Sequence, residues 1–254
     1  MSSFDLSGRV AIVTGGNGGI GLGMAEGIAA AGATVVLAGR NAGKGAAAVK
    51  QIAEAGGKTE FAEVDVTSES SCRALIENAA AKHGRLDILV NNAGTNIRKP
   101  PDVLTAAEWH TVIDTNLTSA FVCTHAAYPH MKQAGGGKII NIGSMMSIFG
   151  ASFAPAYAAS KGGIVQFSRA CATAWAKDNI QVNAVLPGWI DTELTQNARR
   201  EVAGLHERVL GRTPAGRWGV PADFAGIAVF LSSPASDFVT GTAIPVDGGY
   251  SVQG

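Results

Sequence analysis

The sequence predicts an α/β protein: a single doubly wound domain in which helices cover both faces of a mostly parallel sheet of about seven strands. Short apolar runs rich in β-branched residues alternate along the chain with Ala-rich segments of helical character. Such runs are typical of strands that are buried on both faces, as they are in a parallel sheet. No linker and no internal repeat divides the sequence, so we interpret residues 1–254 as one domain.

The composition argues against several classes of partner. The chain has 20 Lys and Arg and 20 Asp and Glu, so its formal net charge is zero, and no block of like charge would attract nucleic acid or an anionic membrane. The first residues lack the apolar run of a secretory signal, and no apolar stretch reaches the ~20 residues of a membrane span. Three scattered cysteines without metal-ligand spacing favour reduced thiols. We expect a cytoplasmic protein with no metal, no nucleic-acid partner and no membrane partner.

The first strand is predicted at Val10–Val13, and it leads into a glycine-rich turn and a helix that ends near Gly32. Glycines in such a turn let the backbone approach a pyrophosphate closely, and the helix N-terminus offers free N–H groups and a favourable dipole. The candidate phosphate-binding residues are Gly15, Asn17, Gly19, Ile20 and Gly21. The alternative interpretation is a tight turn that binds nothing.

The second strand, Thr34–Ala38, is followed by Gly39, Arg40 and Asn41. An acidic residue at this point would accept hydrogen bonds from an adenosine ribose and would repel a 2′-phosphate. Arg40 stands there instead, and a guanidinium binds phosphate in bidentate fashion. The position therefore favours NADP over NAD, with a solvated loop arginine as the alternative.

The third strand is predicted around Phe61–Val66, after an Ala-rich helix through Val49 and Ile52. Asp65, near the carboxyl end of this strand, is a candidate for the adenine amino group, together with Val66. Asp65 is also a candidate cap for the next helix, which we expect from about Ser70 to Lys82. Both roles are compatible.

The fourth strand, Leu86–Val90, ends in the turn residues Asn91–Gly94. Asn and Gly supply turn chemistry and side-chain hydrogen bonds. In a doubly wound sheet, ligands lie at this edge, so Asn92, Ala93 and Gly94 are candidate cofactor residues. Asn91 is equally suited to holding neighbouring strands together.

A long helical pattern from Leu104 to Lys132 contains Asn116, which is unfavourable by propensity in the middle of a helix. A local break that exposes a carbonyl would be a functional reason for this residue, and a buried structural asparagine is the default alternative. The fifth strand, Lys138–Ile142, ends at Gly143 and Ser144.

Tyr157 and Lys161 lie four residues apart in the next helical segment, which runs to about Trp175, so they share one face about one turn apart. A free tyrosine has a pKa near ~10 and is a poor base at neutral pH, whereas a neighbouring ammonium favours the phenolate. Ser144 is positioned to donate a hydrogen bond to the same substrate oxygen. The three side chains suit proton transfer to or from an alcohol or carbonyl oxygen, and an ordinary helix surface is the alternative.

The sixth strand, Ile180–Val185, is closed by Pro187 and Gly188. The irregular segment 189–218, with a helical piece near residues 193–210, has the length and position of a substrate lid. A final helix at about residues 221–232 and a strand at Thr242–Val246 complete the alternation.

Taken together, the motifs resemble those of the short-chain dehydrogenase/reductase family, in the same order and spacing. They are Thr14-Gly15, Gly19-Ile20-Gly21, Asn91-Asn92-Ala93-Gly94, Asn116, Ser144, Tyr157, Lys161 and Pro187-Gly188. The resemblance implies a Rossmann-type oxidoreductase that exchanges a hydride between NAD(P) and a small-molecule alcohol or ketone. It implies that Tyr157 is the general acid/base, that Lys161 lowers its pKa and holds the nicotinamide ribose, that Ser144 orients the substrate oxygen and that Asn116 anchors a water in a proton relay.

The resemblance also implies the remaining contacts of the cofactor. Asn91 to Gly94 would lie along the adenosine and ribose, and Asp65 and Val66 against the adenine. The residues expected around the nicotinamide are Pro187, Gly188, Ile190 and Thr192, with Thr192 bound to its amide. Family members are commonly tetramers, so a homotetramer is expected.

Within the family, three stretches resemble the bacterial sugar-acid dehydrogenases of the gluconate 5-dehydrogenase and 2-deoxygluconate 3-dehydrogenase type. They are residues 92–100, 140–147 and 212–219. A hydroxy acid brings a carboxylate that needs a cation, and Arg98 is the first candidate, ahead of Arg212 and Arg217. The alternatives are an NADPH-dependent ketoreductase of apolar or acyl-carrier-bound ketones and a non-catalytic dinucleotide-binding regulator.

Overall fold

Seven parallel strands form a single sheet in the computed structural model, which describes residues 3–253. The strands are β1 Val10–Thr14, β2 Thr34–Gly39, β3 Lys58–Glu63, β4 Ile88–Asn91, β5 Gly137–Ile142, β6 Ile180–Pro187 and β7 Ala243–Val246. Their order across the sheet is β3-β2-β1-β4-β5-β6-β7, so the direction of winding reverses between β1 and β4. This doubly wound, Rossmann-type topology confirms the predicted fold class and places the ligand crevice at the carboxyl ends of β1 and β4.

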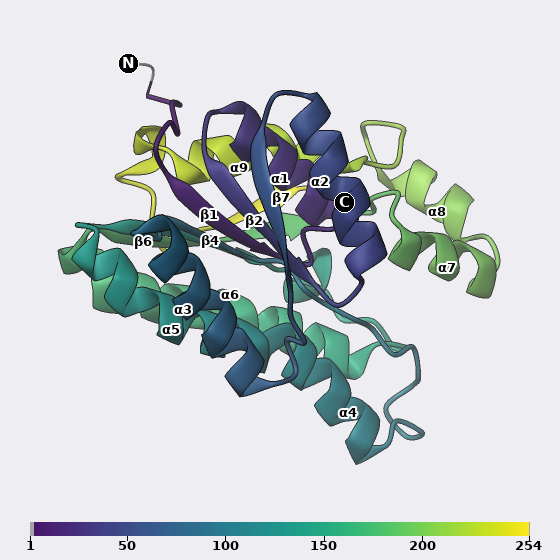
Figure 1. Cartoon of the computed structure of the whole chain (residues 1–254). Helices are drawn as coiled ribbons and strands as arrows, with labels where there is room; N and C mark the ends of the chain where they lie inside the picture. The colour runs from purple at the N-terminus through teal and green to yellow at the C-terminus, as the bar shows by residue number, and fades with distance from the viewer. Residues whose placement is uncertain (1–2, 254) are drawn as a thin grey trace.

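Helices cover both faces of the sheet, as Figure 1 shows. They are α1 Gly19–Ala30, α2 Ala42–Glu54, α3 Glu69–His83, α4 Ala106–Ile113, α5 Ser119–Gln133, α6 Pro155–Trp175, α7 Glu193–Glu201, α8 Leu205–Arg212 and α9 Ala225–Ser232. Helices α1, α2 and α9 lie on one face and α3, α5 and α6 on the other, while α7 and α8 project beyond the sheet (Figure 1). No helix within residues 3–253 is long and apolar enough to cross a membrane.

Side chains of each strand point alternately to the two faces of the sheet, so the core consists of two apolar layers. In β1, Val13 packs into the layer that holds Met24 and Ile28 of α1, whereas Ile12 faces the opposite layer, which holds Ile76 of α3. Successive side chains of a strand point to opposite faces, so a continuous apolar run fills both layers at once. Glycine at position 23 allows α1 to approach closely, because a Cβ there would collide with the main-chain oxygen of Pro221.

Four of the sequence-based boundaries and interpretations needed correction. The third strand runs over Lys58–Glu63 and not Phe61–Val66. It is the edge strand and is largely half-exposed, so it contains polar residues at its start, which a search for apolar runs passes over. The pattern from Leu104 to Lys132 is not one regular helix but α4 and α5 joined by a π-helical turn, Asp114–Thr118.

The helical piece near residues 193–210 is two helices, separated at Gly204, whose φ of 67° lies in the left-handed region. Asp65 does not cap α3; Ser68 does, by accepting a hydrogen bond from Ser71 N, while the Asp65 carboxylate accepts from Thr67.

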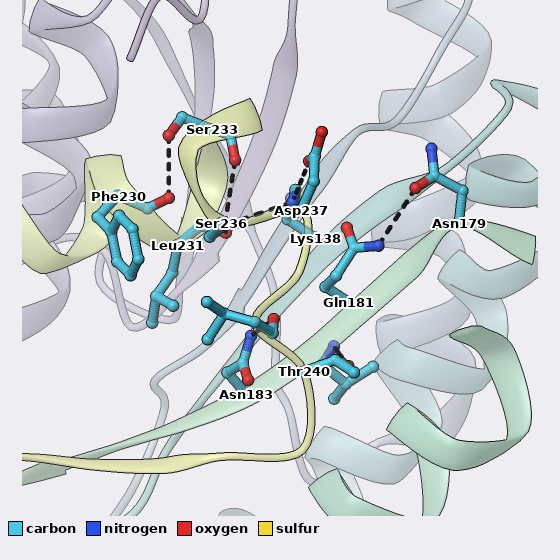
Figure 2. A network of polar contacts seen from close by, with 12 residues as sticks. Lys138, Asn179, Gln181, Asn183, Phe230, Leu231, Ser233, Ser236, Asp237 and Thr240 are labelled. Atoms are coloured by element: carbon cyan, nitrogen blue, oxygen red, sulfur yellow. Dashed lines mark hydrogen bonds and ion pairs between the residues drawn. The ribbon is translucent and has the colours of Figure 1, made fainter. Parts of the chain in front are cut away.

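A polar network fixes the segment before β7 against the amino ends of β5 and β6 (Figure 2). Lys138, buried at the start of β5, donates to Ser236 Oγ at 3.3 Å and to Asp237 Oδ1 at 2.7 Å. Asn183 of β6 donates to the Val239 carbonyl at 2.8 Å, and Thr240 Oγ1 accepts from Val182 N. Burial lowers the pKa of Lys138, and the Asp237 carboxylate opposes that shift. These bonds set the register in which the last strand joins the sheet.

Asp87 joins the amino ends of β1 and β4. Its side chain is only 3% exposed, and it accepts hydrogen bonds from Arg9 Nη1 at 2.8 Å, from the Val10 amide at 2.9 Å and from two nitrogens of Arg85. Burial raises the pKa of Asp87, but these donors outweigh it and hold the pKa below the ordinary value. The ionised carboxylate therefore contributes to stability.

Replacement of Asp87 by Asn should lower the free energy of unfolding at pH 7 by ~1.5–3 kcal/mol, the range for a hydrogen bond to a charged group. Because the folded pKa lies below the unfolded value of 3.8, the contribution is present above that value and is lost as pH falls through the folded pKa. Urea denaturation of both proteins should show the gap at pH 7 and a smaller gap below about pH 4. Asp102→Asn, which removes an exposed acid that has no ion pair within residues 3–253, is the control. A gap that is the same at both pH values would contradict this assignment.

Candidate active site

The turn after β1 has room for phosphate because of its glycines. Gly15 and Gly19 adopt φ values of 64° and 53°, which disfavour side chains. A Cβ on Gly21 would collide with Asn92 Nδ2, which donates to the carbonyl oxygens of Thr14 and Gly15 at 3.0 and 3.1 Å. Helix α1 starts without a side-chain cap and without an acidic residue in its first turn. Its amide groups are therefore available to an anion, and the turn fits a pyrophosphate.

Thr14, at the end of β1, appeared in the sequence analysis only as part of the glycine motif and was given no role there. Its hydroxyl accepts hydrogen bonds from the amides of Asn92 and Ala93 at 3.0 and 3.1 Å and donates to the Val90 carbonyl. It thereby ties the glycine turn to the turn after β4. Its place directly before the glycine motif was the available signal.

Arg40 lies at the carboxyl end of β2 with an exposed side chain, and it forms no ion pair or hydrogen bond with another residue of the range 3–253. Asp65 faces the same region: hydrogen bonds from Thr67, and to a smaller degree the charge of Arg40, lower the pKa of that carboxyl. The side-chain oxygen of Asn41 is already used, since it accepts from Lys44 N and caps α2, which leaves only the side-chain NH2 group to donate. At this corner of the crevice, the guanidinium of Arg40 is the cationic group left free for an anion.

Lys161 and Tyr157 meet at the carboxyl end of β5. Lys161 is only 4% exposed, donates through Nζ to the Ile142 carbonyl at 2.7 Å and has this atom 5.6 Å from the centroid of the Tyr157 ring. Burial lowers the pKa of Lys161 to about 8. Burial raises the pKa of Tyr157 above its ordinary value, and a hydrogen bond with Ser144 and the positive charge of Arg98 offset this only in part, so the lowering expected from Lys161 is not found. The three predicted residues Ser144, Tyr157 and Lys161 are therefore brought together.

Ser147, which the sequence analysis also missed, fixes Ser144 relative to α6. Its Oγ accepts from Ser144 N at 3.2 Å and donates to the Lys161 carbonyl at 2.5 Å. The Ser144 hydroxyl in turn accepts from Met146 N at 3.1 Å. A serine in a short loop gives no sequence signal for such a role, because its partner is set by the tertiary structure.

Asn116 lies in the π-helical turn Asp114–Thr118 and is buried. Its side chain donates to the Thr95 carbonyl and to Ser160 Oγ and accepts from Thr95 N, at 2.9, 3.0 and 2.8 Å. A Cβ on Gly94 would lie 3.4 Å from Asn116 Oδ1 and 3.7 Å from Lys161 Nζ. The side chain of Asn116 therefore holds the loop after β4 beside Lys161. This is the buried structural role that the sequence analysis gave as the alternative. The helix also departs locally from α-geometry at this residue.

The segment after β6 closes against the glycine turn. A Cβ on Gly19 would lie 3.3 Å from Thr192 Cγ2, so the two loops are in direct contact. Ile190 is buried and forms an isolated bridge to Gly219. Directly after Thr192, Glu193 at the start of α7 pairs with Lys44 of α2, with 2.5 Å between Nζ and Oε2. Helix α7 therefore spans from the cofactor side of the crevice toward the loop after β4.

The three candidate cations for a carboxylate differ in their partners. Arg98 pairs with Glu201 of α7 and also donates to the Leu194 carbonyl. Its neighbour Lys99 pairs with Glu108, and Arg217 makes two hydrogen bonds to Asp223. Arg212 has no acidic partner among the described residues; its guanidinium carbon lies 4.4 Å from the Tyr250 ring centroid.

The remaining predicted positions line the same edge of the sheet. Asn92, Ala93 and Gly94 follow β4; Pro187, Gly188 and Ile190 follow or end β6; and Val66 follows β3. The Ile20 side chain packs against the core layer of α1, so only its main chain faces the turn. No group of three or more metal-ligating side chains occurs within residues 3–253.

Comparisons with known proteins agree with this arrangement. A family model described as enoyl-(acyl carrier protein) reductase matches residues 15–251. The 2-dehydro-3-deoxy-D-gluconate 5-dehydrogenase of Escherichia coli K12 is 42% identical over 251 residues, 98% of each chain. The gluconate 5-dehydrogenase of Burkholderia cenocepacia J2315, solved in complex with NADP and tartrate, superposes with a TM-score of 0.93 at 40% identity and 98% coverage of both chains. A short-chain type dehydrogenase/reductase from Mycobacterium marinum gives 0.92 at 35% identity, covering 98% of this chain and 97% of that one. The chain belongs to the short-chain dehydrogenase/reductase family and is an NAD(P)-dependent oxidoreductase.

Proposed function

We propose that this oxidoreductase acts on sugar acids with NADP as its preferred cofactor, interconverting a secondary alcohol and a ketone. The observation that carries the proposal is the meeting of Tyr157, Lys161 and Ser144 beside a glycine turn that fits a pyrophosphate. The substrate class is supported by relatives named 2-dehydro-3-deoxy-D-gluconate 5-dehydrogenase and gluconate 5-dehydrogenase. It is also supported by the position of Arg98, whose charge reaches Tyr157.

The proton is handled by Tyr157. In the oxidation direction its phenolate accepts the hydroxyl proton of the substrate, and in reduction the phenol returns a proton to the carbonyl oxygen. Ser144 donates a hydrogen bond to that oxygen and keeps it beside Tyr157. Lys161, with a pKa of about 8, remains mostly charged at neutral pH and favours the phenolate. NADP, when bound, supplies or accepts the hydride at its nicotinamide ring.

We assign the main-chain carbonyl of Asn116, and not its side chain, to the proton relay. Both N–H groups of its side-chain amide are engaged, with the Thr95 carbonyl and Ser160 Oγ, and the amide oxygen accepts from Thr95 N. The π-helical turn changes the main-chain hydrogen bonding at this position, and its carbonyl is the group to hold a water near Lys161.

The cofactor would be held by the main chain of the glycine turn and by side chains around it. The proposed contacts are Gly15, Asn17, Gly19, Ile20 and Gly21 for the pyrophosphate, Arg40 and Asn41 for the 2′-phosphate, Asp65 and Val66 for the adenine, Asn92, Ala93, Gly94, Tyr157 and Lys161 for the riboses, and Pro187, Gly188, Ile190 and Thr192 for the nicotinamide. Residues 189–218 are the substrate lid of a single catalytic domain, residues 1–254.

We also propose a homotetramer in the cytoplasm. Phe121 of α5 is 48% exposed, and its ring lies 6.1 Å from that of Phe167 on α6. Two aromatic side chains on neighbouring long helices favour burial by another subunit.

The second candidate is a ketoreductase of acyl-carrier-bound ketones, which the description of the matching family model suggests. Docking an acidic carrier requires unpaired basic residues near the crevice. Lys44, Arg98 and Lys99 lie there, but each is paired with a glutamate, whereas Arg40 and Arg212 form no ion pair within residues 3–253. A screen of sugar acids, polyols and carrier-bound ketones against both cofactors, followed by nicotinamide absorbance, separates the two candidates.

Tyr157→Phe retains the ring and its packing but removes the group that exchanges the proton. We expect turnover to fall by ~10²–10⁴, the usual contribution of a positioned acid/base, while NADP binding measured by fluorescence is retained. Tyr128→Phe, which removes a hydroxyl bonded to Asp178 away from the site, should leave turnover near that of the wild type. Turnover of Tyr157→Phe at the wild-type level would refute the role of this residue.

Arg40→Asp should weaken NADP and improve NAD, because it replaces attraction of the 2′-phosphate with repulsion. A charge-assisted contact contributes ~1.5–3 kcal/mol, which is roughly ten- to a hundred-fold in affinity. The measurement is the ratio of kcat/KM values for the two cofactors. Lys50→Asp, on the exposed side of α2, makes the same charge change and should leave the ratio unaltered. Equal use of both cofactors by the unmodified enzyme would indicate that Arg40 does not bind the 2′-phosphate and is an ordinary surface residue.

Arg98→Ala should lower kcat/KM by ~10-fold or more for a sugar acid and have little effect on the matching uncharged polyol or ketose, since only the acid loses a charged hydrogen bond. Lys99→Ala, the neighbouring cation paired with Glu108, is the matched control. An equal loss on both substrates would indicate loop disorder, and no loss on either would remove Arg98 from the site.

A further inference from the structure

Arg98 is held by the lid and not by its own loop. Its Nη1 lies 3.0 Å from Glu201 Oε2, and its Nη2 donates to the Leu194 carbonyl at 3.3 Å, so it contacts both ends of α7. The two partners of the ion pair differ in their environment: the side chain of Arg98 is 17% exposed and that of Glu201 is 56% exposed. Glu201 is therefore largely hydrated already and can turn into water, whereas Arg98 is the more buried charge and would then need another anion.

Arg98 lies in the same part of the crevice as Tyr157, since its positive charge acts to lower the pKa of that phenol. Lys161 is the other cation near this ring, with Nζ 5.6 Å from the ring centroid. A guanidinium has five N–H donors in one plane, and the contacts with Glu201 and Leu194 use two of them. An anion that binds beside Tyr157 would meet these donors and would be repelled by the Glu201 carboxylate.

Helix α7 does not depend on Glu201 alone for its position. At its other end, Glu193 pairs with Lys44, and Thr192 contacts the glycine turn. The hydrogen bond from Arg98 to the Leu194 carbonyl does not depend on the charge of Glu201, because its acceptor is a main-chain oxygen of α7. Loss of the pair between Arg98 and Glu201 therefore leaves α7 attached at three points.

We propose that Glu201 is an exchangeable internal counter-ion for Arg98, which the carboxylate of an acid substrate displaces into solvent. The inference rests on the proposed function, because it requires Arg98 to receive the substrate carboxylate. It adds a specificity-determining residue outside the catalytic set. Glu201 competes with acid substrates for the guanidinium, and an uncharged substrate, which leaves the ion pair intact, gains nothing from its removal.

The test is Glu201→Gln, which keeps the size and polarity of the side chain and removes its charge. KM for a sugar acid should fall roughly two- to five-fold, the range for loss of a competing, partly exposed ion pair, with kcat little changed. KM for the matching uncharged substrate should stay the same, so that the ratio of the two KM values changes. Glu207→Gln removes the same charge from exposed helix α8, where no ion pair involves this residue within the described range, and should leave the ratio unaltered.

A second arm separates direct competition from a looser lid. In the Arg98→Ala background, Glu201→Gln should have no effect on the ratio, because there is no guanidinium to release. A ratio that shifts as much in this background as in the wild type, or as much in Glu207→Gln, would overturn the inference.

A third arm keeps this inference distinct from the proposed function. Tartrate, a hydroxy dicarboxylate, is used as an inhibitor of turnover of an uncharged substrate, and Glu201→Gln should lower its inhibition constant by the same factor. If sugar acids are not turned over by the wild type, the proposed function fails, whereas the tartrate result still reports on the counter-ion. If sugar acids are turned over and neither KM nor the inhibition constant responds to Glu201→Gln, the counter-ion role alone is wrong.

Discussion

The geometry of the site depends on a buried hydrogen bond between two asparagines. Asn91 ends β4 and lies opposite Asn141 of β5 in the sheet register. Its Nδ2 donates to Asn141 Oδ1 at 2.8 Å and to Thr124 Oγ1 of α5 at 2.9 Å, and Asn141 donates to Ser168 of α6 at 2.8 Å. This small cluster therefore joins β4, β5, α5 and α6, which are followed by residues 92–94, followed by Ser144, preceded by the turn of Asn116, and carry Tyr157 and Lys161, respectively. Separation of these elements would leave further polar groups buried without partners, as the Asn91 side-chain oxygen already is, so the cluster favours one arrangement.

The rigidity of this cluster matters because a small displacement of β5 would change the environment of Lys161. Lys161 is nearly inaccessible to solvent, and its ammonium is bound by the Ile142 carbonyl at the end of β5. Burial lowers its pKa to about 8, and the hydrogen bond to Ile142 holds the ammonium 5.6 Å from the centroid of the Tyr157 ring. In the proposed mechanism, the charged form of Lys161 favours the phenolate of Tyr157. The position of one main-chain oxygen at the end of β5 therefore fixes the charge on which that mechanism depends.

The sequence allowed most of the sheet to be predicted, because strands buried on both faces carry continuous apolar runs such as Val10–Val13. It failed at the edge strand, where Lys58 and Glu60 are polar and half of the environment is solvent. The catalytic candidates could be predicted because they form a motif with fixed spacing. Their supports, Thr14 and Ser147, could not, since a hydroxyl finds its partner only after distant segments have packed. The break at Gly204 was likewise hidden inside a continuous helical pattern.

The residues proposed for proton transfer and those proposed for specificity lie on parts of the fold with different packing. The proposed proton-transfer residues lie at buried strand ends and on α6, where apolar layers and hydrogen bonds restrict movement. The residues proposed to face the rest of the substrate lie on the loop after β4 and on α7, which shares with α8 a small apolar cluster separate from the main core. Helix α7 is joined to α2 and to the loop after β4 by ion pairs with at least one exposed partner, and such pairs contribute little to stability and exchange readily. The proposed replacement of the Glu201 charge by a substrate carboxylate would therefore cost little, and the positions of Tyr157, Lys161 and Ser144 do not depend on these ion pairs.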